Sequence, residues 1–304
     1  MIRSDHCKPY SQSQARHTPP ARSLLPLSVH VLLLALVLTL VVSGCVAPAS
    51  APSPQDTPVI LHPQDQKMKT IGMIGGISWV SSAEYYRMMN HMVQDEYGEQ
   101  NSAHILLYSI EFGEFSKQER LADEGDWEGL TMIMVDAAER LERGGADCII
   151  ICSNTMHSTI PAIEAAVDIP IISIIDETGK RVREKNITTV GLLGTKKTMS
   201  AEFYKEELRE EFGLVVLVPD MADQEIVNNV IFDELCVDYI NPASKEEYKR
   251  IISNLIDEGA EGIILGCTEI PLLIRQEDVD VPIFDTTRIH AEAAVRYALN
   301  HTPA

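Results

Sequence analysis

The sequence is poor in basic side chains. Its 304 residues carry 25 Lys and Arg against 45 Asp and Glu, so the formal net charge is −20. The acidity lies in residues 68–304, which hold 20 of the basic groups and 42 of the acidic groups. Proteins that bind nucleic acids neutralise phosphates with clustered Lys and Arg. No such cluster occurs in this sequence, so a nucleic-acid partner is not expected.

Cysteine is also scarce, and its spacing excludes several kinds of site. The 6 cysteines form no C-x-x-C motif, no zinc-ligand spacing and no dense disulfide framework. We therefore expect no metal site. The sequence also lacks the G-x-G-x-x-G spacing of a dinucleotide-binding turn, although Gly72, Gly75 and Gly76 lie close together. A nucleotide-dependent dehydrogenase is therefore disfavoured.

The first 67 residues differ in composition from the rest of the chain. Four basic residues precede a nearly unbroken apolar run from Leu24 to Val42, which contains Pro26 and is short for a membrane-spanning helix. The run ends in Val42-Ser43-Gly44-Cys45, which resembles a bacterial lipobox, where the cysteine is lipidated and becomes the mature N-terminus. The Pro-, Ala- and Ser-rich stretch that follows is typical of an extended tether.

We therefore expect a signal peptide with a lipobox over residues 1–45, lipidation at Cys45, and a tether over residues 46–67. The expected location is the cell envelope, with the protein lipid-anchored on the periplasmic or extracytoplasmic face. Two alternatives stay open. The segment could be an uncleaved anchor, or translation could begin at Met68, which would make the protein cytoplasmic.

From Lys69 onward, short apolar runs alternate with amphipathic stretches. Strands are expected at Thr70–Ile74, Ile105–Ile110, Cys148–Cys152, Ile169–Ile174, Thr189–Leu193, Val215–Val218, Gly262–Leu265 and Val281–Phe284. Helical periodicity fills most gaps, for example at Ser82–Asp95, Leu130–Arg143, Ala201–Glu211, Lys245–Glu258 and Arg288–Asn300. Strands that are apolar throughout and separated by helices are typical of parallel sheets covered on both faces. The predicted fold class is therefore α/β.

The same part of the chain contains an internal repeat. Three pairs of similar segments recur at a spacing of 112 to 119 residues: Thr70–Gly75 with Thr189–Gly194, Gly145–Ile151 with Gly259–Leu265, and Asp168–Ile171 with Asp280–Ile283. The repeat predicts that the chain is built from two halves of one design that face each other.

The repeat brings two short polar motifs to equivalent positions. An offset of 114 residues pairs Ser153 with Cys267, and Asn154-Thr155 with Thr268-Glu269. Each motif follows a predicted strand, and ligands bind at the carboxyl ends of the strands in parallel α/β sheets. We therefore expect Ser153 and Cys267 to face one substrate in the cleft between the halves.

At these residues the sequence resembles the aspartate/glutamate racemase family, whose members racemise amino acids without a cofactor. The resemblance rests on the segments Lys69–Gly76, Ser153–His157 and Gly266–Glu269, and it extends over residues 68–300. The segments Gly76–Trp79 and Ile231–Cys236 resemble the branch that has broad specificity or acts on L-aspartate and L-glutamate.

The resemblance implies a fold and an assembly. It implies two pseudo-symmetric, doubly wound parallel-sheet domains, with the active site in the cleft between them. The first domain would comprise residues 68–175 plus 286–304, and the second would comprise residues 176–285. The resemblance also implies a small-molecule amino-acid substrate and a homodimer.

The family's reaction uses two opposed bases, usually cysteines. One base removes the α-proton and the other returns a proton from the opposite face. The resemblance assigns these catalytic roles to Cys267 and Ser153. Cys267 lies between a strand end and an expected helix over Glu269–Ile274, and a helix N-terminus lowers the pKa of a thiol. We therefore expect a lowered pKa for Cys267.

Ser153 departs from the family's usual cysteine. A serine hydroxyl is a poor base unless another group activates it, and Cys152 points to the other face of its strand. Three interpretations stay open: Ser153 relays a proton with water or His157, Cys267 works far better in one direction, or racemisation has been lost. His157 could equally be a packing residue.

Binding roles follow from the resemblance as well. It places Asn154, Thr155, Thr268 and Glu269 around the substrate. Gly76 and Ser78 would offer backbone N–H groups to a carboxylate at a helix start, and Thr195 would do the same from the other half. A cation for the side chain of a dicarboxylic substrate would come from one of four residues: Lys117, Arg120, Lys196 or Lys197.

Two other functions stay open. Cys267 alone would suffice in a decarboxylase or a cis–trans isomerase of small dicarboxylates from the same superfamily. A lipid-anchored solute-binding protein would also combine a tether with two α/β lobes, but it needs no thiol in its cleft.

Overall fold

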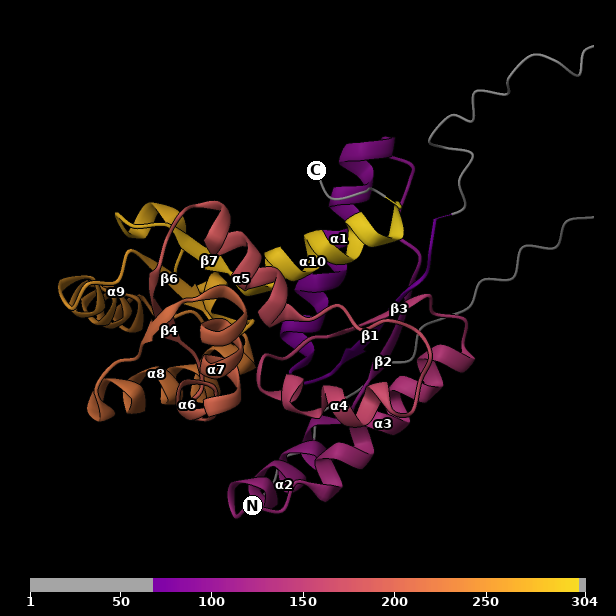
Figure 1. Cartoon of the computed structure of the whole chain (residues 1–304), viewed down its shortest axis with the longest axis horizontal. Coiled ribbons are helices and arrows are strands. Elements are labelled where there is room, and N and C mark those ends of the chain that lie inside the picture. The colour runs from indigo at the N-terminus through magenta and orange to yellow at the C-terminus, as the bar shows by residue number, and fades with distance from the viewer. Residues whose placement is uncertain (1–67, 301–304) are drawn as a thin grey trace, which may run out of the picture. The chain divides into compact units, whose positions relative to one another are not determined.

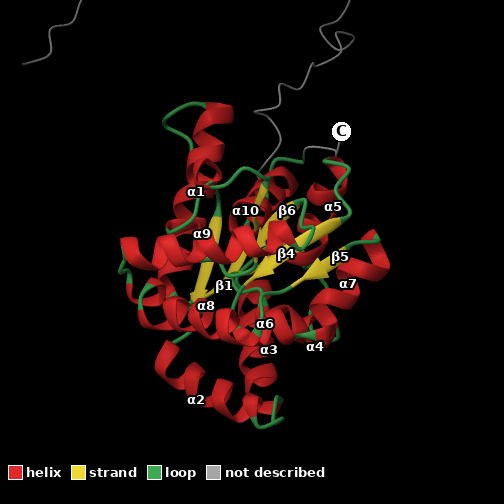
Figure 2. Ribbon diagram, turned by 90° about the vertical axis from the view of Figure 1, so that its left-hand side faces the viewer, coloured by secondary structure: helices red, strands yellow, loops and turns green. Residues whose placement is uncertain are grey.

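Residues 68–300 form two parallel β-sheets that are surrounded by helices (Figure 1, Figure 2). The structure is a computed structural model, and these are the residues that it describes. The predicted signal peptide, the lipidated Cys45 and the tether lie outside the described residues. Within the described part of the chain, no helix is long and apolar enough to cross a membrane.

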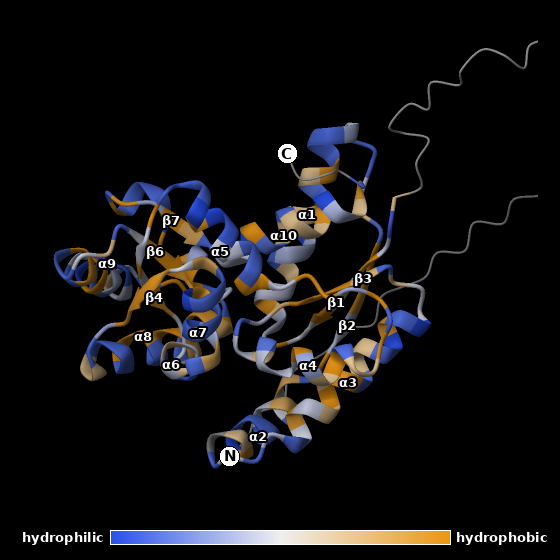
Figure 3. Ribbon diagram, in the orientation of Figure 1, coloured by the Kyte–Doolittle hydropathy of each residue, from blue (hydrophilic) through white to orange (hydrophobic). Residues whose placement is uncertain are grey.

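The first sheet has three strands in the order β2-β1-β3. Its strands are β1 (Ile71–Gly75), β2 (Ile105–Ser109) and β3 (Cys148–Ile151). The helical segments of this half are α1 (Trp79–Tyr97), α2 (Phe112–Asp123), α3 (Glu128–Arg143), η2 (Thr155–Thr159) and α4 (Ile160–Glu164). All residues of β1 and β3 are buried, as expected of strands covered on both faces. Figure 3 shows the same concentration of apolar residues in the strands.

The second sheet has four strands in the order β5-β4-β6-β7. Its strands are β4 (Thr189–Leu193), β5 (Val215–Leu217), β6 (Gly262–Leu265) and β7 (Ile283–Asp285). The helical segments that follow in chain order are α5 (Ile174–Glu184), α6 (Lys196–Ser200), α7 (Glu202–Phe212), α8 (Met221–Asp233), η3 (Leu235–Val237), α9 (Pro242–Asp257), η4 (Ile270–Leu272), η5 (Gln276–Asp278) and α10 (Thr286–Ala298). The two sheets share one strand order, β5-β4-β6 matching β2-β1-β3, which confirms the predicted pseudo-symmetric α/β fold.

One predicted strand is wrong. The segment Ile169–Ile174 forms only a single bridge, between Ile171 and Ile149. Pro170 has no N–H to donate to a ladder, and Ser173 caps the next helix, where its side chain accepts the Asp176 N–H. The apolar run passes from a one-residue bridge into helix α5. Its counterpart in the second half has Pro282 and the helix cap Asp285 at the equivalent positions and still forms the three-residue strand β7, so neither feature explains the difference.

The last helix returns to the first sheet. Helix α10 follows β7, but it packs against α1, β1 and β3 as well as α5, and Figure 1 shows it beside α1. Its residues Ala291 and Ala294 lie in one apolar cluster with Ile71 and Ile150. The chain therefore links the two sheets through α5 and α10. The domain boundaries at residues 175 and 286 stay a prediction.

Gly76 fixes the turn after β1, and its replacement is expected to destabilise the fold. Its φ of +85° favours glycine, and an added Cβ would lie 2.1 Å from the Ile110 carbonyl oxygen. We expect Gly76→Ala to lower the free energy of unfolding by about 3 kcal/mol or more, from strain plus overlap. Gly98 has a similar φ of +96° but nothing within 4 Å of an added Cβ. Gly98→Ala should therefore cost only about 1 kcal/mol. Urea denaturation of both variants checks this, and equal losses would contradict it.

Candidate active site

Eight of the predicted site residues line one cavity at the carboxyl ends of the strands. They are Ser78, Ser153, Asn154, Thr155, Thr195, Cys267, Thr268 and Glu269. These residues come from the loops after β1, β3, β4 and β6, so both halves of the repeat contribute to one site, as the sequence predicts. Gly76 and His157 do not line this cavity.

Glu269 is the centre of the hydrogen bonds on one side of the cavity. Its Oε1 accepts the Ser78 hydroxyl at 2.8 Å, and its Oε2 accepts the Cys267 thiol at 3.0 Å and the Thr268 hydroxyl at 3.1 Å. Only 2% of Glu269 is exposed, so these donors satisfy a carboxylate that would otherwise be costly to bury. The carboxylate therefore serves the neighbouring thiol rather than lying free for a substrate.

The expectation of a lowered pKa for Cys267 is wrong. Burial, followed by the Glu269 carboxylate, raises the pKa of the Cys267 thiol well above its ordinary value. The expected helix after it is a single 3₁₀ turn, η4, which offers little dipole to offset these effects. Cys267 is therefore a thiol at neutral pH, and the nearest acceptor for its proton is Glu269.

The opposite side of the cavity carries a hydroxyl at the position that corresponds to Glu269 in the repeat. Thr155, the counterpart of Glu269 in the repeat, has its Oγ1 2.9 Å from the Thr198 Oγ1, which lies 3.1 Å from the Thr195 Oγ1. The Ser153 hydroxyl makes no hydrogen bond with another residue of the described chain. The residues at corresponding positions of the repeat are thus chemically unequal, because a thiol that donates to a carboxylate on one side corresponds to hydroxyls on the other.

Asn154 joins the strand ends of the two sheets. Its Oδ1 accepts the Tyr204 hydroxyl at 3.0 Å, and its Nδ2 donates to Thr286 Oγ1 at 3.1 Å. Thr286 in turn donates to the Leu265 carbonyl at 2.7 Å. Both ends of the amide are therefore engaged in holding the strand ends, which leaves Asn154 one N–H for a substrate.

His157 lies beneath Ser153 and not in the cavity. Its Nε2 accepts the Ile174 N–H at 2.9 Å, so the ring proton is on Nδ1, which donates to the Ser153 carbonyl at 2.8 Å. Burial, and then His290, lowers the pKa of His157 to about 3. Both ring nitrogens are occupied, so His157 positions the Ser153 backbone, and the structure supports the packing interpretation over a proton relay.

The two buried histidines predict a loss of stability in acid. Burial lowers the pKa of His157 to about 3 and that of His290 to about 4, whereas an unfolded histidine titrates near about 6.5. A pKa that is lowered by folding gives stability that is complete above the unfolded pKa and is lost as the pH falls toward the folded value. The free energy of unfolding should fall by roughly 1.4 kcal/mol per pH unit per histidine between about pH 6 and 4.

Urea denaturation between pH 7 and pH 4 measures this slope. In His157→Gln one of the two titrating groups is gone, so the stability at pH 7 is lower but the dependence on pH is shallower. An unchanged slope in this variant would contradict a neutral, buried His157 as a source of the acid sensitivity.

Gly76 shapes the loop after β1 and does not offer its N–H to the cavity. That N–H donates to the Ser82 Oγ at 2.9 Å, and Ser82 Oγ donates to the Ser78 carbonyl at 3.0 Å. The loop therefore places the Ser78 hydroxyl against Glu269. The backbone donors that the sequence predicts at Gly76 are used within the loop itself.

The predicted cations gather at a second hollow beside the cavity, with one exception. This hollow of about 470 Å³ shares Phe112, Glu119, Thr195 and Phe232 with the active-site cavity, and three cations line it: Arg120, Lys196 and Lys197. Lys196 pairs with Glu225, and Lys197 lies over the Trp127 ring. Arg120 makes no ion pair with the described residues. Lys117 pairs with Glu114 and is exposed.

Several site residues were not predicted individually. Ile231, Phe232 and Cys236, from α8 and η3, form one wall of the cavity, and Thr198 completes the hydroxyl chain. The hydroxyl at Thr198 follows the repeated Gly194 closely, which is the signal that could have found it. Among residues 68–300, no group of His, Cys, Asp and Glu could hold a metal ion.

Comparisons with known proteins agree with this geometry. Residues 74–294 match the family model "Asp/Glu/Hydantoin racemase". The chain is 45% identical to a candidate Asp/Glu racemase from Yersinia pestis, whose crystal structure it matches with a TM-score of 0.70 over 76% of this chain and 100% of the other. It is 38% identical to an aspartate racemase homologue from Pyrococcus horikoshii, with a TM-score of 0.66 over 76% and 99% of the chains.

A curated relative that matches over nearly its whole length is the broad specificity amino-acid racemase RacX of Bacillus subtilis. It is 24% identical over 231 residues, which are 74% of this chain and 96% of the relative. The family model spans most of the chain and includes every strand except the start of β1, together with all the residues of the cavity. The chain therefore belongs to the Asp/Glu/hydantoin racemase family.

Proposed function

We propose that the protein is a cofactor-independent amino-acid racemase of the aspartate/glutamate type, which interconverts L- and D-amino acids. The observation that carries the proposal is the pairing of Cys267 and Ser153, which follow equivalent strands and line one cavity from the two halves of the repeat. Inversion of a stereocentre by proton transfer needs one group on each face of the α-carbon. Decarboxylation or cis–trans isomerisation would not require this second group.

The proposed chemistry begins with Glu269. Its carboxylate takes the proton of the Cys267 thiol, and the thiolate so formed removes the α-proton of the substrate. The electron pair of the C–H bond remains on the substrate as a carbanion. Donation of the Ser153 hydroxyl proton to the opposite face gives the opposite enantiomer. The Ser153 alkoxide then regains a proton from water, and Glu269 gives its proton to the hydroxide so formed, which restores both groups. Thr155, Thr195 and Thr198 line that side and offer hydroxyl hydrogen bonds to the substrate.

The inequality of the two sides has a consequence for the reaction. A thiol with an adjacent carboxylate exchanges protons readily, whereas a serine hydroxyl without a hydrogen-bonded base does so poorly. Proton transfer on the Ser153 side is therefore the slower step. When Cys267 removes the α-proton, the carbanion takes a proton back from Cys267 more often than from the Ser153 side. The starting enantiomer is therefore re-formed more often than the opposite enantiomer is made.

Arg120 is proposed to select acidic substrates. It lies in the hollow next to the cavity and makes no ion pair with the described residues, so its guanidinium is available for a side-chain carboxylate. Arg120→Gln is expected to raise KM for aspartate and glutamate about 10-fold, with little change in kcat, and to leave neutral amino acids unaffected. Lys117→Gln, on the same helix but outside the hollow, is the matched control. Steady-state kinetics with both substrate types decide this. An equal effect on neutral substrates would contradict it.

The experiment that tests the proposed function measures the product directly. The full-length protein is incubated with L-aspartate, L-glutamate and a panel of neutral L-amino acids, and chiral chromatography quantifies the D-isomers. We expect at least one substrate to approach an equal mixture of enantiomers without added pyridoxal phosphate or metal. Release of carbon dioxide, or conversion only of unsaturated dicarboxylates, would instead support the alternative reactions.

Location and assembly are proposed from the sequence. The lipobox-like Val42–Cys45 segment supports a lipoprotein that is anchored through Cys45 at the cell envelope, where it would act outside the cytosol. The relationship to the racemases supports a homodimer. Detergent-phase partition of the wild type and of Cys45→Ala tests the anchor, and light scattering tests the dimer. An equal distribution of both proteins in the aqueous phase would remove the lipid anchor.

A further inference from the structure

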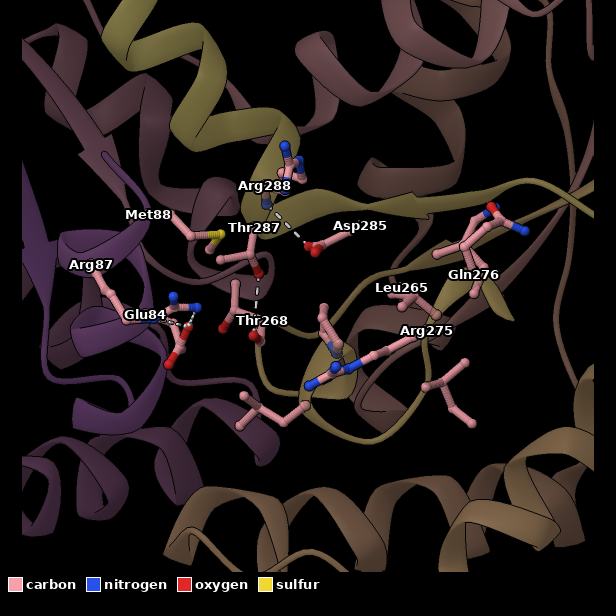
Figure 4. A pocket seen from close by; sticks show the side chains of 14 residues that line it. Glu84, Arg87, Met88, Leu265, Thr268, Arg275, Gln276, Asp285, Thr287 and Arg288 are labelled. Atoms are coloured by element: carbon pink, nitrogen blue, oxygen red, sulfur yellow. Dashed lines mark hydrogen bonds and ion pairs between the residues drawn. The ribbon is translucent and has the colours of Figure 1, made fainter. Parts of the chain in front are cut away.

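A second pocket lies behind the loop that carries Cys267. It has a volume of about 470 Å³ and is lined by residues of α1, the η4–η5 segment and the start of α10 (Figure 4). Thr268 is the one residue that also lines the active-site cavity. The pocket is therefore a separate site that touches the catalytic loop from its other side.

Cations dominate the rim of this pocket in an otherwise acidic chain. Arg87, Arg275 and Arg288 line it, against two carboxylates, Glu84 and Asp285. In Figure 4, Arg87 and Arg275 extend into the pocket from opposite walls. Because residues 68–304 have a net charge of −22, three guanidinium groups around one hollow are an unusual local feature. They favour a negatively charged ligand.

The arginines differ in how far the protein itself neutralises them. Arg87 pairs with Glu84 at 2.7 Å, and Arg288 pairs with Glu292 at 2.9 Å. Asp285 caps α10 by accepting the Arg288 backbone N–H at 3.0 Å. The Arg275 guanidinium makes no ion pair with any residue that the structure describes. It is therefore the group on which an incoming anion gains most, because no existing ion pair must break.

Most of the remaining lining is apolar, with Thr268, Gln276 and Thr287 as the uncharged polar residues. Met88, Pro271, Leu272 and Ile283 lie between the charged groups, and apolar lining with a few placed polar groups is the usual composition of a small-molecule site. We propose that this pocket binds a small organic dianion, with two carboxylates that reach Arg87 and Arg275 and an apolar body that lies on these residues.

Thr287 connects this pocket to the loop that carries Cys267. That residue lines the pocket, and its hydroxyl donates to the Thr268 carbonyl at 3.2 Å. The Thr268 hydroxyl donates in turn to the Glu269 carboxylate, which holds the Cys267 thiol. A bound dianion that contacts both α1 and the η4–η5 segment restricts their movement relative to each other. It therefore changes turnover without occupying the substrate cavity. This coupling rests on the proposed racemase function, whereas the binding itself does not.

Calorimetry with adipate, a six-carbon dicarboxylate without an amino group, tests the binding. Arg275→Gln should weaken adipate binding about 10-fold or more, as expected for the loss of a charge-assisted contact. Arg209→Gln, an exposed arginine on α7, and Arg120→Gln, at the active-site hollow, should leave it unchanged. Pyrophosphate, which has charge but no apolar body, should bind at least about 10-fold more weakly than adipate.

Each other result would overturn the proposal. Equal affinity of the wild type and Arg275→Gln for adipate, or a loss of adipate binding in Arg120→Gln, would place adipate elsewhere. Tighter binding of pyrophosphate than of adipate would contradict the proposed contact between the ligand and the apolar residues. Once a racemised substrate is known, adipate should change kcat with KM for the substrate unaffected, and the effect should disappear in Arg275→Gln. A purely competitive effect would contradict the separate site. A chain with no racemase activity leaves the calorimetric result intact, so the two failures are distinguishable.

Discussion

Replacement of Cys267 by alanine is expected to lower kcat/KM for racemisation by about 10³-fold or more. The thiol donates to the Glu269 carboxylate at 3.0 Å, and it follows the strand of the second half that is equivalent to the strand before Ser153. Loss of a general acid–base group costs about 10²–10⁴-fold, and here the same group also serves the reverse reaction. Chiral chromatography with the best substrate measures the loss.

A second buried thiol provides the control for this prediction. Cys148 is fully buried at the start of β3, and burial raises the pKa of its thiol to about 12, but it does not line the cavity. Cys148→Ala removes a thiol of similar burial, and its activity should stay within about 3-fold of the wild type. If Cys267→Ala retained a tenth of the activity, or if both variants lost equally, Cys267 would not be the base.

The second large effect is expected from Glu269→Gln. In the wild type, the Cys267 proton moves to the adjacent carboxylate. The enzyme is therefore active at a pH well below the raised pKa of the thiol. The amide of the variant has almost the same shape as this carboxylate but cannot accept the proton. We expect kcat/KM to fall about 10²-fold near pH 7.

The pH profile separates this role from a structural one. In the variant the thiolate forms only by loss of its proton to solvent, so activity should rise with pH across the alkaline range. The Glu269 charge contributes to the raised pKa of Cys267. Removal of this charge in the variant lowers the pKa of the thiol. The rise in activity should therefore begin at a lower pH than the pKa of the wild-type thiol would give. A loss of activity that is equal at every pH would mean that Glu269 only holds the loop.

Glu234→Gln is a matched control for the carboxylate. Glu234 accepts the Asn241 amide at 3.0 Å and the Ser244 hydroxyl at 2.9 Å, on the segment that leads to η3. Its replacement also removes a partly buried carboxylate that accepts side-chain hydrogen bonds, but no thiol donates to it. We expect a change in stability without a change in the form of the pH profile.

The repeat in the sequence predicts most of the fold and the position of the site. Strands β1 and β4 are repeated segments, and the motifs after β3 and β6 face one cavity because parallel strands bring their carboxyl ends to one edge. The segment at Ile169–Ile174 could not be placed from its apolar pattern. It forms a single bridge before helix α5, whereas the repeated segment, with a proline and a helix cap at the equivalent positions, forms β7. No local feature of the sequence separates the two cases.

The chemistry of individual residues depended on contacts that the sequence does not contain. The pKa of Cys267 follows from burial and from Glu269, two residues later, whose side chain turns back to accept its proton. The Asn154 Oδ1 accepts a hydrogen bond from Tyr204, and the His157 Nε2 accepts one from the backbone N–H of Ile174. In each case a short loop brings together groups that periodicity can place on a strand end but cannot orient.

The central claim is that two unequal groups, Cys267 with Glu269 and Ser153 with its neighbouring hydroxyls, act on opposite faces of one α-carbon. The most direct test incubates the L- and D-enantiomers of a substrate separately in D₂O and follows α-proton loss by NMR and inversion by chiral chromatography. We predict that one enantiomer exchanges its α-proton faster than it inverts, because Cys267 returns deuterium to the same face. The other should exchange only as fast as it inverts. Exchange and inversion at equal rates for both enantiomers, or no exchange with either, would contradict the account.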